Sequence, residues 1–365
     1  MKAKGVKSIA VMTGGGDCPG LNAVIRAVTK TAINKFGLDV WGIEDGYLGL
    51  IEDRMHALSY NDVSDILTVG GTILGSSNSV NPFKYRMTVG KTSRARDASD
   101  NCIKVLKDHY IDALICIGGD GTMTSAAAFA RKGVNVMGVP KTIDNDLYGT
   151  DITFGFNTAV TIATEAIDKI HTTASSHHRV MIVEVMGRYA GWIALYAGVA
   201  SGSDVILLPE MPYQLDKICD FVLGRSRRGK RFSIVVAAEG AKEKGGKMVV
   251  AKKLAHSPDP IRLGGVANVL VGQISERARL ECRAVVLGHV QRGGTPTPFD
   301  RALATKFGHK AIELLMKGVR NHLVVQKDGK LSSIPLSRVA GKIKTVPRNH
   351  PLIKAALAVG TSFGV

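Results

Sequence analysis

The chain has few aromatic residues, few cysteines and no long apolar run. Only 5% of its 365 residues are aromatic, so the side chains on which nucleic-acid bases stack are scarce. Its five cysteines lie far apart without a CxxC pair, which argues against a zinc site and a disulfide framework and fits a reducing cytoplasm. Ile9–Met12 is too short for a signal-peptide core, and no stretch approaches the roughly 18 apolar residues of a membrane span. We expect a cytoplasmic protein.

Acidic residues are also in short supply, because 31 Asp and Glu stand against 48 Lys and Arg, a net charge of +17. A balance this basic attracts nucleic acid, an anionic membrane surface or phosphorylated substrates, and by itself does not choose among them. The basic residues are spread in short groups such as Arg225–Arg231 and Lys342–Arg348. Together with the scarcity of aromatics, this argues against nucleic acid, and we expect neither nucleic acid nor a membrane as partner.

What is present is a repeated pattern of short apolar runs, each followed by an amphipathic stretch. The pairs of run and stretch are Val6–Met12 with Leu21–Ile33, Ala113–Ile117 with Met123–Arg131, and Val180–Val185 with Tyr189–Val199. Such repetition of strand, loop and helix predicts parallel sheets covered on both faces. Further buried strands are predicted at Val134–Val139, Val205–Leu208, Ser233–Ala238 and Ala284–Leu287. These are more strands than one modest sheet holds, so we expect two α/β domains.

The loops that follow these strands are rich in glycine, acids and arginine. In open α/β sheets, ligands bind beyond the carboxyl ends of the strands, so these loops are where chemistry is expected. They are Gly14–Asp17, Gly118–Thr122, Pro140–Asp146, Met186–Arg188, Glu239–Gly240 and Gly288–Arg292. By contrast, Asn78–Lys91 is predicted to be a polar loop, and the last 50 or so residues carry no recognisable motif.

Two of these loops have the composition of anion sites. Gly14–Gly20 follows a strand and opens a helix, so its backbone amides can approach an anion at the helix N-terminus, although a tight turn explains it equally well. It matches neither GxGxxG, as a dinucleotide dehydrogenase would need, nor the Walker pattern; Gly90 lacks the Walker glycine five residues earlier, where Tyr85 stands. Gly118–Thr122 repeats the arrangement with Asp120 inside it, a carboxylate suited to Mg²⁺ bridging phosphate oxygens.

A third loop brings two carboxylates and a hydroxyl close together. In an extended segment side chains alternate, so Thr142, Asp144 and Asp146 are expected to point to one side. Carboxylates that close repel unless a metal or a substrate proton separates them, which suits general-base catalysis beside Mg²⁺. An Asx turn is the structural alternative.

Four arginines complete the candidate set. Arg179, Arg188, Arg283 and Arg292 flank predicted strand ends, and Arg292 shares the loop Gly288–Gly294 with His289. Guanidinium groups suit phosphate, and four of them at ligand-facing ends predict an anion pocket. The alternative for any one of them is a solvated surface charge.

Six segments, in this order, closely resemble the phosphofructokinase family over roughly residues 8–315. They are Gly15–Asp17, Gly70–Ser76, Gly118–Thr122, Thr142–Asp146, Glu184–Arg188 and Leu287–Gly294. The resemblance implies two Rossmann-like parallel-sheet α/β domains with the active site between them. It also implies transfer of a phosphoryl group from ATP to the 1-hydroxyl of fructose 6-phosphate, as in glycolysis. A lipid or NAD kinase with a similar glycine loop lacks the segments at 186–188 and 287–294.

The resemblance further implies domain limits and partners. The donor-binding domain would comprise residues 1–153 plus 291–340, and the sugar-phosphate domain residues 154–290 plus 341–365. Mg²⁺ would be the cofactor. The protein would form a homodimer or homotetramer with active sites shared between subunits.

Roles carry over residue by residue from the same resemblance. The catalytic group is Asp144 as the base, with Thr142, Asp146, Arg188 and Gly121. The donor phosphates are held by Gly15, Asn78, Gly118, Gly119, Asp120, Gly121 and Thr122, with Asp120 as the metal ligand. Fructose 6-phosphate is bound by Thr142, Ile143, Asp144, Met186, Gly187, Arg188, Glu239, His289, Val290, Gln291 and Arg292. Arg179 and Arg283 match arginines that reach the site from a neighbouring subunit.

The identity of the donor rests on a few positions. Asn78 stands where many ATP-using bacterial members have an arginine, which leaves Lys84 or Arg86 as substitutes. Lys141 is typical of pyrophosphate-using and of plant- or trypanosome-like members, whereas Gly121 is typical of ATP users. We expect ATP as the donor, with a pyrophosphate-dependent phosphotransferase as the alternative.

Overall fold

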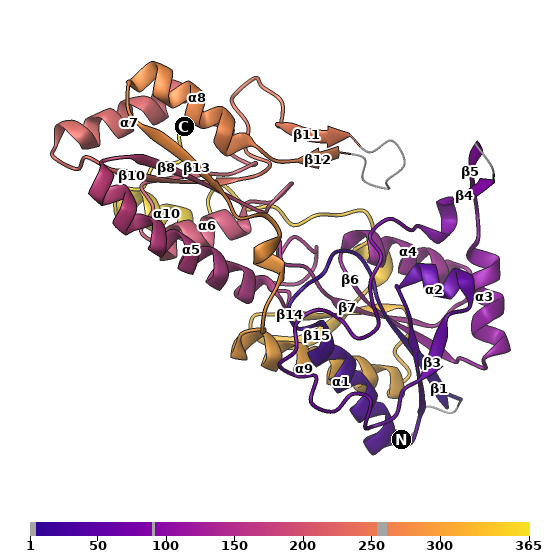
Figure 1. The fold of residues 1–365 in the computed structure, drawn as a ribbon. Helices are drawn as coiled ribbons and strands as arrows, with labels where there is room; N and C mark the ends of the chain where they lie inside the picture. Colours follow the sequence, from indigo (N-terminus) through magenta and orange to yellow (C-terminus); the bar gives the residue numbers. More distant parts are fainter. Residues whose placement is uncertain (1–4, 90–91, 254–260) are drawn as a thin grey trace. The chain divides into compact units, whose positions relative to one another are not determined.

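The computed structural model describes residues 5–89, 92–253 and 261–365 (Figure 1). The chain forms two compact units. Unit 1 comprises Met1–Ile143, Leu147–Asn157 and Arg292–Ile343, and unit 2 comprises Asp144–Asp146, Thr158–Gln291 and Lys344–Val365. Each passage of the chain from one unit to the other lies within a few residues of an expected domain limit, apart from the short excursion at Asp144–Asp146.

Unit 1 is built on a seven-stranded sheet in the order β15-β14-β7-β6-β1-β2-β3. Its strands are β1 (Ser8–Thr13), β2 (Asp39–Ile43), β3 (Met55–Ala57), β6 (Ala113–Gly118), β7 (Val136–Pro140), β14 (His322–Lys327) and β15 (Lys330–Pro335). The five strands from β14 to β2 run parallel, and β3 and β15 close the edges in antiparallel pairing. Every residue of β1, β6 and β7 is buried, as expected for strands covered on both faces.

Helices pack on this sheet and enclose its core. They are α1 (Leu21–Thr31), which a π turn (η1, Ala32–Phe36) extends, α2 (Tyr47–Glu52), α3 (Ser99–Asp108), α4 (Asp120–Arg131) and α9 (Pro298–Met316). The α1 and α9 helices pack against each other. The start of α9 is encoded locally, because Thr297 accepts a hydrogen bond from the Asp300 N–H and Pro298 fills the first turn.

The segment predicted to be a polar loop is different in the structure. Residues Pro82–Lys84 form a 3₁₀ turn (η2), and β4 (Tyr85–Val89) pairs in antiparallel register with β5 (Thr92–Arg96). The loop prediction is therefore wrong for Pro82–Val89, while Gly90 and Lys91 lie outside the described residues. The alternation of Tyr85, Met87 and Val89 with polar residues was the signal of a strand.

Unit 2 has a four-stranded, all-parallel sheet in the order β13-β8-β10-β9. Its strands are β8 (Val180–Val185), β9 (Val205–Leu207), β10 (Ser233–Ala238) and β13 (Cys282–Val286). Its helices are α5 (Phe156–His177), which begins in unit 1, α6 (Trp192–Ala200), α7 (Leu215–Arg227), α8 (Val266–Ala278) and α10 (Pro351–Ala358). A separate ribbon pairs β11 (Val250–Lys253) with β12 (Ile261–Leu263).

The predicted α/β architecture with parallel sheets is confirmed. The last 50 residues, which carry no motif, supply β14, β15, a 3₁₀ turn (η4, Leu336–Arg338) and α10. Among the described residues, none of the helices has the length and apolar character needed to cross a membrane.

Candidate active site

In unit 1 the strand order creates a switch point between β1 and β6. The connection that leaves β1 leads to β2 on one side, and the connection that leaves β6 leads to β7 on the other. Ligands of open α/β sheets bind at such points. The loops that follow these two strands are the predicted glycine loops Gly14–Asp17 and Gly118–Thr122, and the Gly14 N–H donates to the Ile117 carbonyl at 2.9 Å. The fold therefore places both loops side by side.

The glycines of these loops are required by close packing. A Cβ on Gly118 would collide with the Thr122 side chain, and Gly15 has a φ of +85°. Gly119 precedes α4 and provides no side-chain cap, so the first N–H groups of this helix are available to an anion. Gly121 differs, because a Cβ there would meet nothing within 4 Å. Asp120, the first residue of α4, is exposed beside it.

A hollow of about 380 Å³ opens next to the first glycine loop, with walls made only of small or polar residues. It is lined by Gly15, Gly16, Asp17, Gly71, Thr72, Ser76, Ser77, Asn78 and Ser79. The two loops that form it are joined, since the Gly15 N–H donates to the Ser77 carbonyl at 3.1 Å and the Ser76 hydroxyl donates to the Gly15 carbonyl at 2.6 Å. Gly15 and Asn78 thus share one hollow. It is also lined by Asp17, Thr72 and Ser76, which lie in the predicted loop Gly14–Asp17 and in the segment Gly70–Ser76 but had no predicted role of their own.

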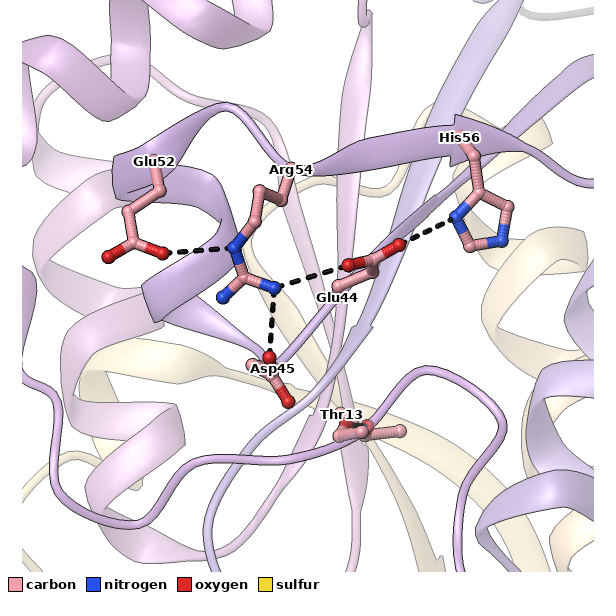
Figure 2. Close-up of polar contacts among 7 residues, drawn as sticks. Thr13, Glu44, Asp45, Glu52, Arg54 and His56 are labelled. Carbon is pink, nitrogen blue, oxygen red and sulfur yellow. Dashed lines mark hydrogen bonds and ion pairs between the residues drawn. The ribbon is translucent and has the colours of Figure 1, made fainter.

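A cluster of polar side chains surrounds Arg54 in unit 1 (Figure 2). The Arg54 guanidinium lies 2.9 Å from Asp45, 3.1 Å from Glu44 and 2.9 Å from Glu52, which raises the pKa of Arg54 above its usual range. The Asp45 N–H donates to the Leu74 carbonyl at 2.8 Å, so the cluster is tied to the loop that carries Asn78. Exposed ion pairs of this kind contribute little to stability individually.

Lys141 lies buried beneath the glycine loops. Its side chain is 4% exposed, and Nζ donates to the Gly16 carbonyl at 2.7 Å. The Lys141 N–H donates to the Gly118 carbonyl at 3.0 Å, so one residue contacts both loops. A buried cation here favours binding of phosphate.

Burial raises the pKa of the neighbouring Cys18 thiol, which keeps it protonated and unsuited to act as a nucleophile.

Arg292, expected in the sugar-phosphate site, belongs to unit 1 and contacts the first glycine loop. It ends the 3₁₀ turn η3 (Gly288–Arg292), and its Nη1 donates to the Asp17 carbonyl at 2.8 Å. Lys84 and Arg86, the substitutes considered for the donor arginine, are exposed in η2 and β4.

The segment Thr142–Asp146 is not extended, contrary to expectation. The chain turns at Ile143–Asp144, and Asn145 has a φ of +50°. Exposure nevertheless alternates along it: Thr142, Asp144 and Asp146 are half-buried, whereas Ile143 and Asn145 are buried. The turn therefore keeps Thr142, Asp144 and Asp146 more exposed than Ile143 and Asn145, although the segment is not a strand.

Unit 2 has its own switch point, between β8 and β10. The connection from β8 passes over β10 to β9, and the connection from β10 passes to β13 on the other side of β8. The loops that follow carry Met186, Gly187, Arg188 and Glu239, and they are joined because the Gly240 N–H donates to the Gly187 carbonyl at 3.1 Å. Four predicted substrate residues thus lie at one edge of this sheet.

The segment after β13 is anchored to this edge by Gln291. Its side chain is fully buried, accepts from the Met186 N–H at 3.2 Å and donates to the Gly288 carbonyl at 3.0 Å. His289 and Val290, which lie between Gly288 and Gln291, are exposed. Gln291 therefore positions the loops, while its neighbours remain accessible.

Arg179 and Arg283 lie elsewhere. Both contact the same Glu281 oxygen, Arg179 Nε at 2.9 Å and Arg283 Nη2 at 2.7 Å. Arg179 directly precedes β8 and Arg283 is the second residue of β13, so both sit at the amino ends of their strands. The expectation that all four arginines face the ligand edge is wrong for these two. The seven residue steps from Arg179 to Met186 span roughly 23 Å, too far for one side chain to bridge.

The carboxylates present can be tested against a magnesium site. Within residues 5–89, 92–253 and 261–365, no three His, Cys, Asp or Glu side chains gather as a ready-made metal site. Mg²⁺ is commonly held by one or two carboxylates together with substrate phosphates, and it keeps several waters. Asp120, exposed at the uncapped start of α4, fits that pattern.

Comparison with known proteins identifies the family of the chain. The family model described as "Phosphofructokinase" matches residues 8–315. The chain is 54% identical over 361 residues to "ATP-dependent 6-phosphofructokinase 2" of Clostridium perfringens, with 98% of each chain covered. It is 49% identical over 342 residues to "Pyrophosphate--fructose 6-phosphate 1-phosphotransferase" of Amycolatopsis mediterranei, covering 93% of this chain and 96% of that one.

The fold also resembles that of a solved phosphofructokinase structure. The T-state crystal structure of Pichia pastoris phosphofructokinase superposes with a TM-score of 0.79 at 33% identity and covers 93% of this chain. This chain spans 38% of that longer protein. With the family model matching most of the chain and relatives near half identity over nearly its full length, the chain belongs to the phosphofructokinase family.

Proposed function

We propose that this protein is an ATP-dependent 6-phosphofructokinase, which transfers the γ-phosphoryl group of ATP to the 1-hydroxyl of fructose 6-phosphate in glycolysis. The observation that carries the proposal is the pair of glycine loops at the unit 1 switch point, with the exposed carboxylate of Asp120 at the start of α4. The name of the Clostridium perfringens relative supports the same activity.

Unit 1 serves as the donor-binding domain. Backbone amides of Gly15 and of the loop Gly118–Thr122 hold the donor phosphates, with Asn78 in the adjoining hollow. Asp120 is the residue that holds Mg²⁺. When bound with the donor, this ion supplies positive charge against the phosphate oxygens. Gly121 leaves room for the larger nucleotide, because nothing lies within 4 Å of its Cβ position.

Unit 2 serves as the sugar-phosphate domain. Met186, Gly187, Arg188 and Glu239 line the carboxyl edge of its sheet, and His289 and Val290 stand exposed beside Gln291. The guanidinium of Arg188 pairs with phosphate. Within unit 1, Arg292 contacts the first glycine loop, and its guanidinium is likewise suited to phosphate.

Asp144 is the general base. It takes the proton of the 1-hydroxyl while that oxygen forms a bond to the γ-phosphorus and the bond from phosphorus to the β,γ-bridging oxygen breaks, so that ADP leaves. Thr142, Ile143 and Asp146 position the reacting groups around it. Arg188 offsets negative charge that develops on the transferred group.

Pyrophosphate is the alternative donor, and one observation favours it. The buried Lys141 Nζ lies 3.2 Å from the place that a Cβ on Gly15 would occupy, where it would neutralise the free end of a pyrophosphate. The Amycolatopsis mediterranei relative carries a pyrophosphate-dependent name. Gly121 argues against pyrophosphate as the donor. An acidic side chain at this position would exclude a nucleotide, and glycine has none.

A homodimer or homotetramer with shared active sites is part of the proposal, and the place of two arginines supports it. Arg179 and Arg283 lie at the amino edge of the unit 2 sheet, beyond reach of its carboxyl edge in the same chain. They would therefore serve the site of a neighbouring subunit.

All five cysteines are buried and free, which supports a cytoplasmic location.

A coupled assay with fructose 6-phosphate tests the proposal. The kcat/KM for ATP should exceed that for pyrophosphate, and Asp144→Asn should lower kcat by about 10²–10⁴-fold with fructose 6-phosphate binding little changed. Turnover of Asp144→Asn within threefold of wild type would overturn the base assignment. Faster turnover with pyrophosphate at equal concentration would overturn the donor assignment alone.

A further inference from the structure

The C-terminal segment makes a specific contact with the loop that carries the proposed base. Lys344 Nζ donates to Asn145 Oδ1 at 3.1 Å, and the Lys344 N–H donates to the Asp146 carbonyl at 2.7 Å. Asn145 is only 4% exposed and stands between Asp144 and Asp146. Lys344 therefore holds the residue that joins the two acids. All of these residues belong to unit 2.

The other side of this segment is fixed just as firmly. The Trp192 indole N–H donates to the Lys344 carbonyl at 3.0 Å, and Lys344 Nζ lies 5.2 Å from the centre of the Trp192 ring. Two residues on, the Val346 N–H donates to Glu210 Oε1 at 2.7 Å, and the same oxygen accepts from the Gly191 N–H at 3.1 Å. The segment thus ties the Asp144–Asp146 loop to the start of α6, which follows Arg188 in the chain.

The conformation of the loop explains why such an anchor is needed. Asn145 has a φ of +50°, a left-handed conformation that asparagine tolerates better than most residues but that still costs energy, so contacts around it help to fix it. A hydrogen bond from an ammonium group is roughly twice as strong as one between neutral groups. A change in Asn145 would turn the peptide planes on both sides of it, and with them the two carboxylates.

We propose that Lys344 is a positioning residue for phosphoryl transfer, which acts by holding Asn145 so that Asp144 and Asp146 keep their productive orientation. This inference rests on the proposed function of Asp144 as the base. Lys344 does not touch the reacting atoms; its effect passes through the loop. It also gives the C-terminal segment, which carries no recognisable motif, a part in catalysis.

Lys344→Met tests the proposal with little disturbance of the fold. The variant keeps the main-chain bonds to Asp146 and Trp192 and leaves an apolar stem over the indole ring. Because small displacements of a catalytic group cost up to about 10²-fold, kcat should fall by roughly 10-fold or more, with KM for both substrates within about threefold of wild type. Lys342→Met is the matched control: this exposed lysine lies 5.1 Å from the Tyr148 ring, and its loss should leave kcat unchanged.

A second variant tests the same contact from its other side. Asn145→Gly removes the acceptor and suits the left-handed backbone, so it should lower kcat like Lys344→Met, and the double variant should be no worse than the poorer single one. If Lys344→Met leaves kcat within threefold of wild type, or if the two losses add, the proposal is overturned. Should Lys344→Met fail to fold, as thermal unfolding would reveal, Asn145→Gly decides alone.

The Asp144→Asn background separates this inference from the proposed function. With the base removed, adding Lys344→Met should lower the residual kcat by less than it lowers the kcat of wild type, since only the orientation of Asp146 is left to lose. A loss as large as in the wild-type background would show that Lys344 does not act through Asp144. If Asp144→Asn itself turns over like wild type, the proposed function fails; if it loses turnover and Lys344→Met does not, only the positioning role fails.

Discussion

Gly121 allows the donor assignment to be tested without disturbing the fold. It lies in the first turn of α4, has no positive φ, is exposed, and a Cβ added to it would meet nothing within 4 Å. Replacing glycine in a helix by another residue is favourable by a few tenths of a kcal/mol, and an acid in the first turn adds about 0.3–1 kcal/mol. The thermal unfolding midpoint of Gly121→Asp should therefore equal or exceed that of wild type.

The effect on the donor should be large. A carboxylate about 5 Å from one phosphate charge is repelled by about 3 kcal/mol at an effective dielectric constant of 20, which corresponds to roughly 100-fold. We expect kcat/KM for ATP in Gly121→Asp to fall by that order in the coupled assay. Gly121→Asn, which adds similar bulk without charge, should lose much less. A value for Gly121→Asp within threefold of wild type would refute the claim that this loop holds the donor phosphates.

Two further predictions concern assembly and pH. If Arg179 serves a neighbouring subunit, mixing Arg179→Ala and Asp144→Asn subunits should restore part of the activity, and verified hybrids that remain inactive would place the site within one chain. Burial raises the pKa of Glu210 above its ordinary value near 4.5, so its contribution to stability is greatest below that pH and is lost as pH rises through the raised value. Wild type should therefore lose stability relative to Glu210→Gln as pH increases above about 4.5 in denaturant unfolding, and a constant difference across that range would contradict this.

The strands and glycine loops were predictable because their signals are local. Apolar runs such as Val180–Val185 coincide with buried strands, since residues covered on both faces of a sheet must be apolar. The loops Gly14–Asp17 and Gly118–Thr122 are recognisable by their glycines, which are needed where backbone segments approach closely. The hairpin of β4 and β5 was missed because its alternating pattern is short and rich in charge.

The tertiary structure decided which distant residues meet. Glu184, part of a segment that resembles the family, turns out to have a structural contact: its buried carboxylate accepts from the N–H groups of Gly265 and Ala267 at 3.0 Å and caps α8. Arg292 contacts Asp17, and Lys344 contacts Asn145, across more than 190 residues of sequence in each case. Strand order and connection direction determine such contacts. Composition and periodicity report only whether a residue is buried and how its immediate neighbours fold, so the sequence by itself determined the parts of the site and the fold alone determined their partners.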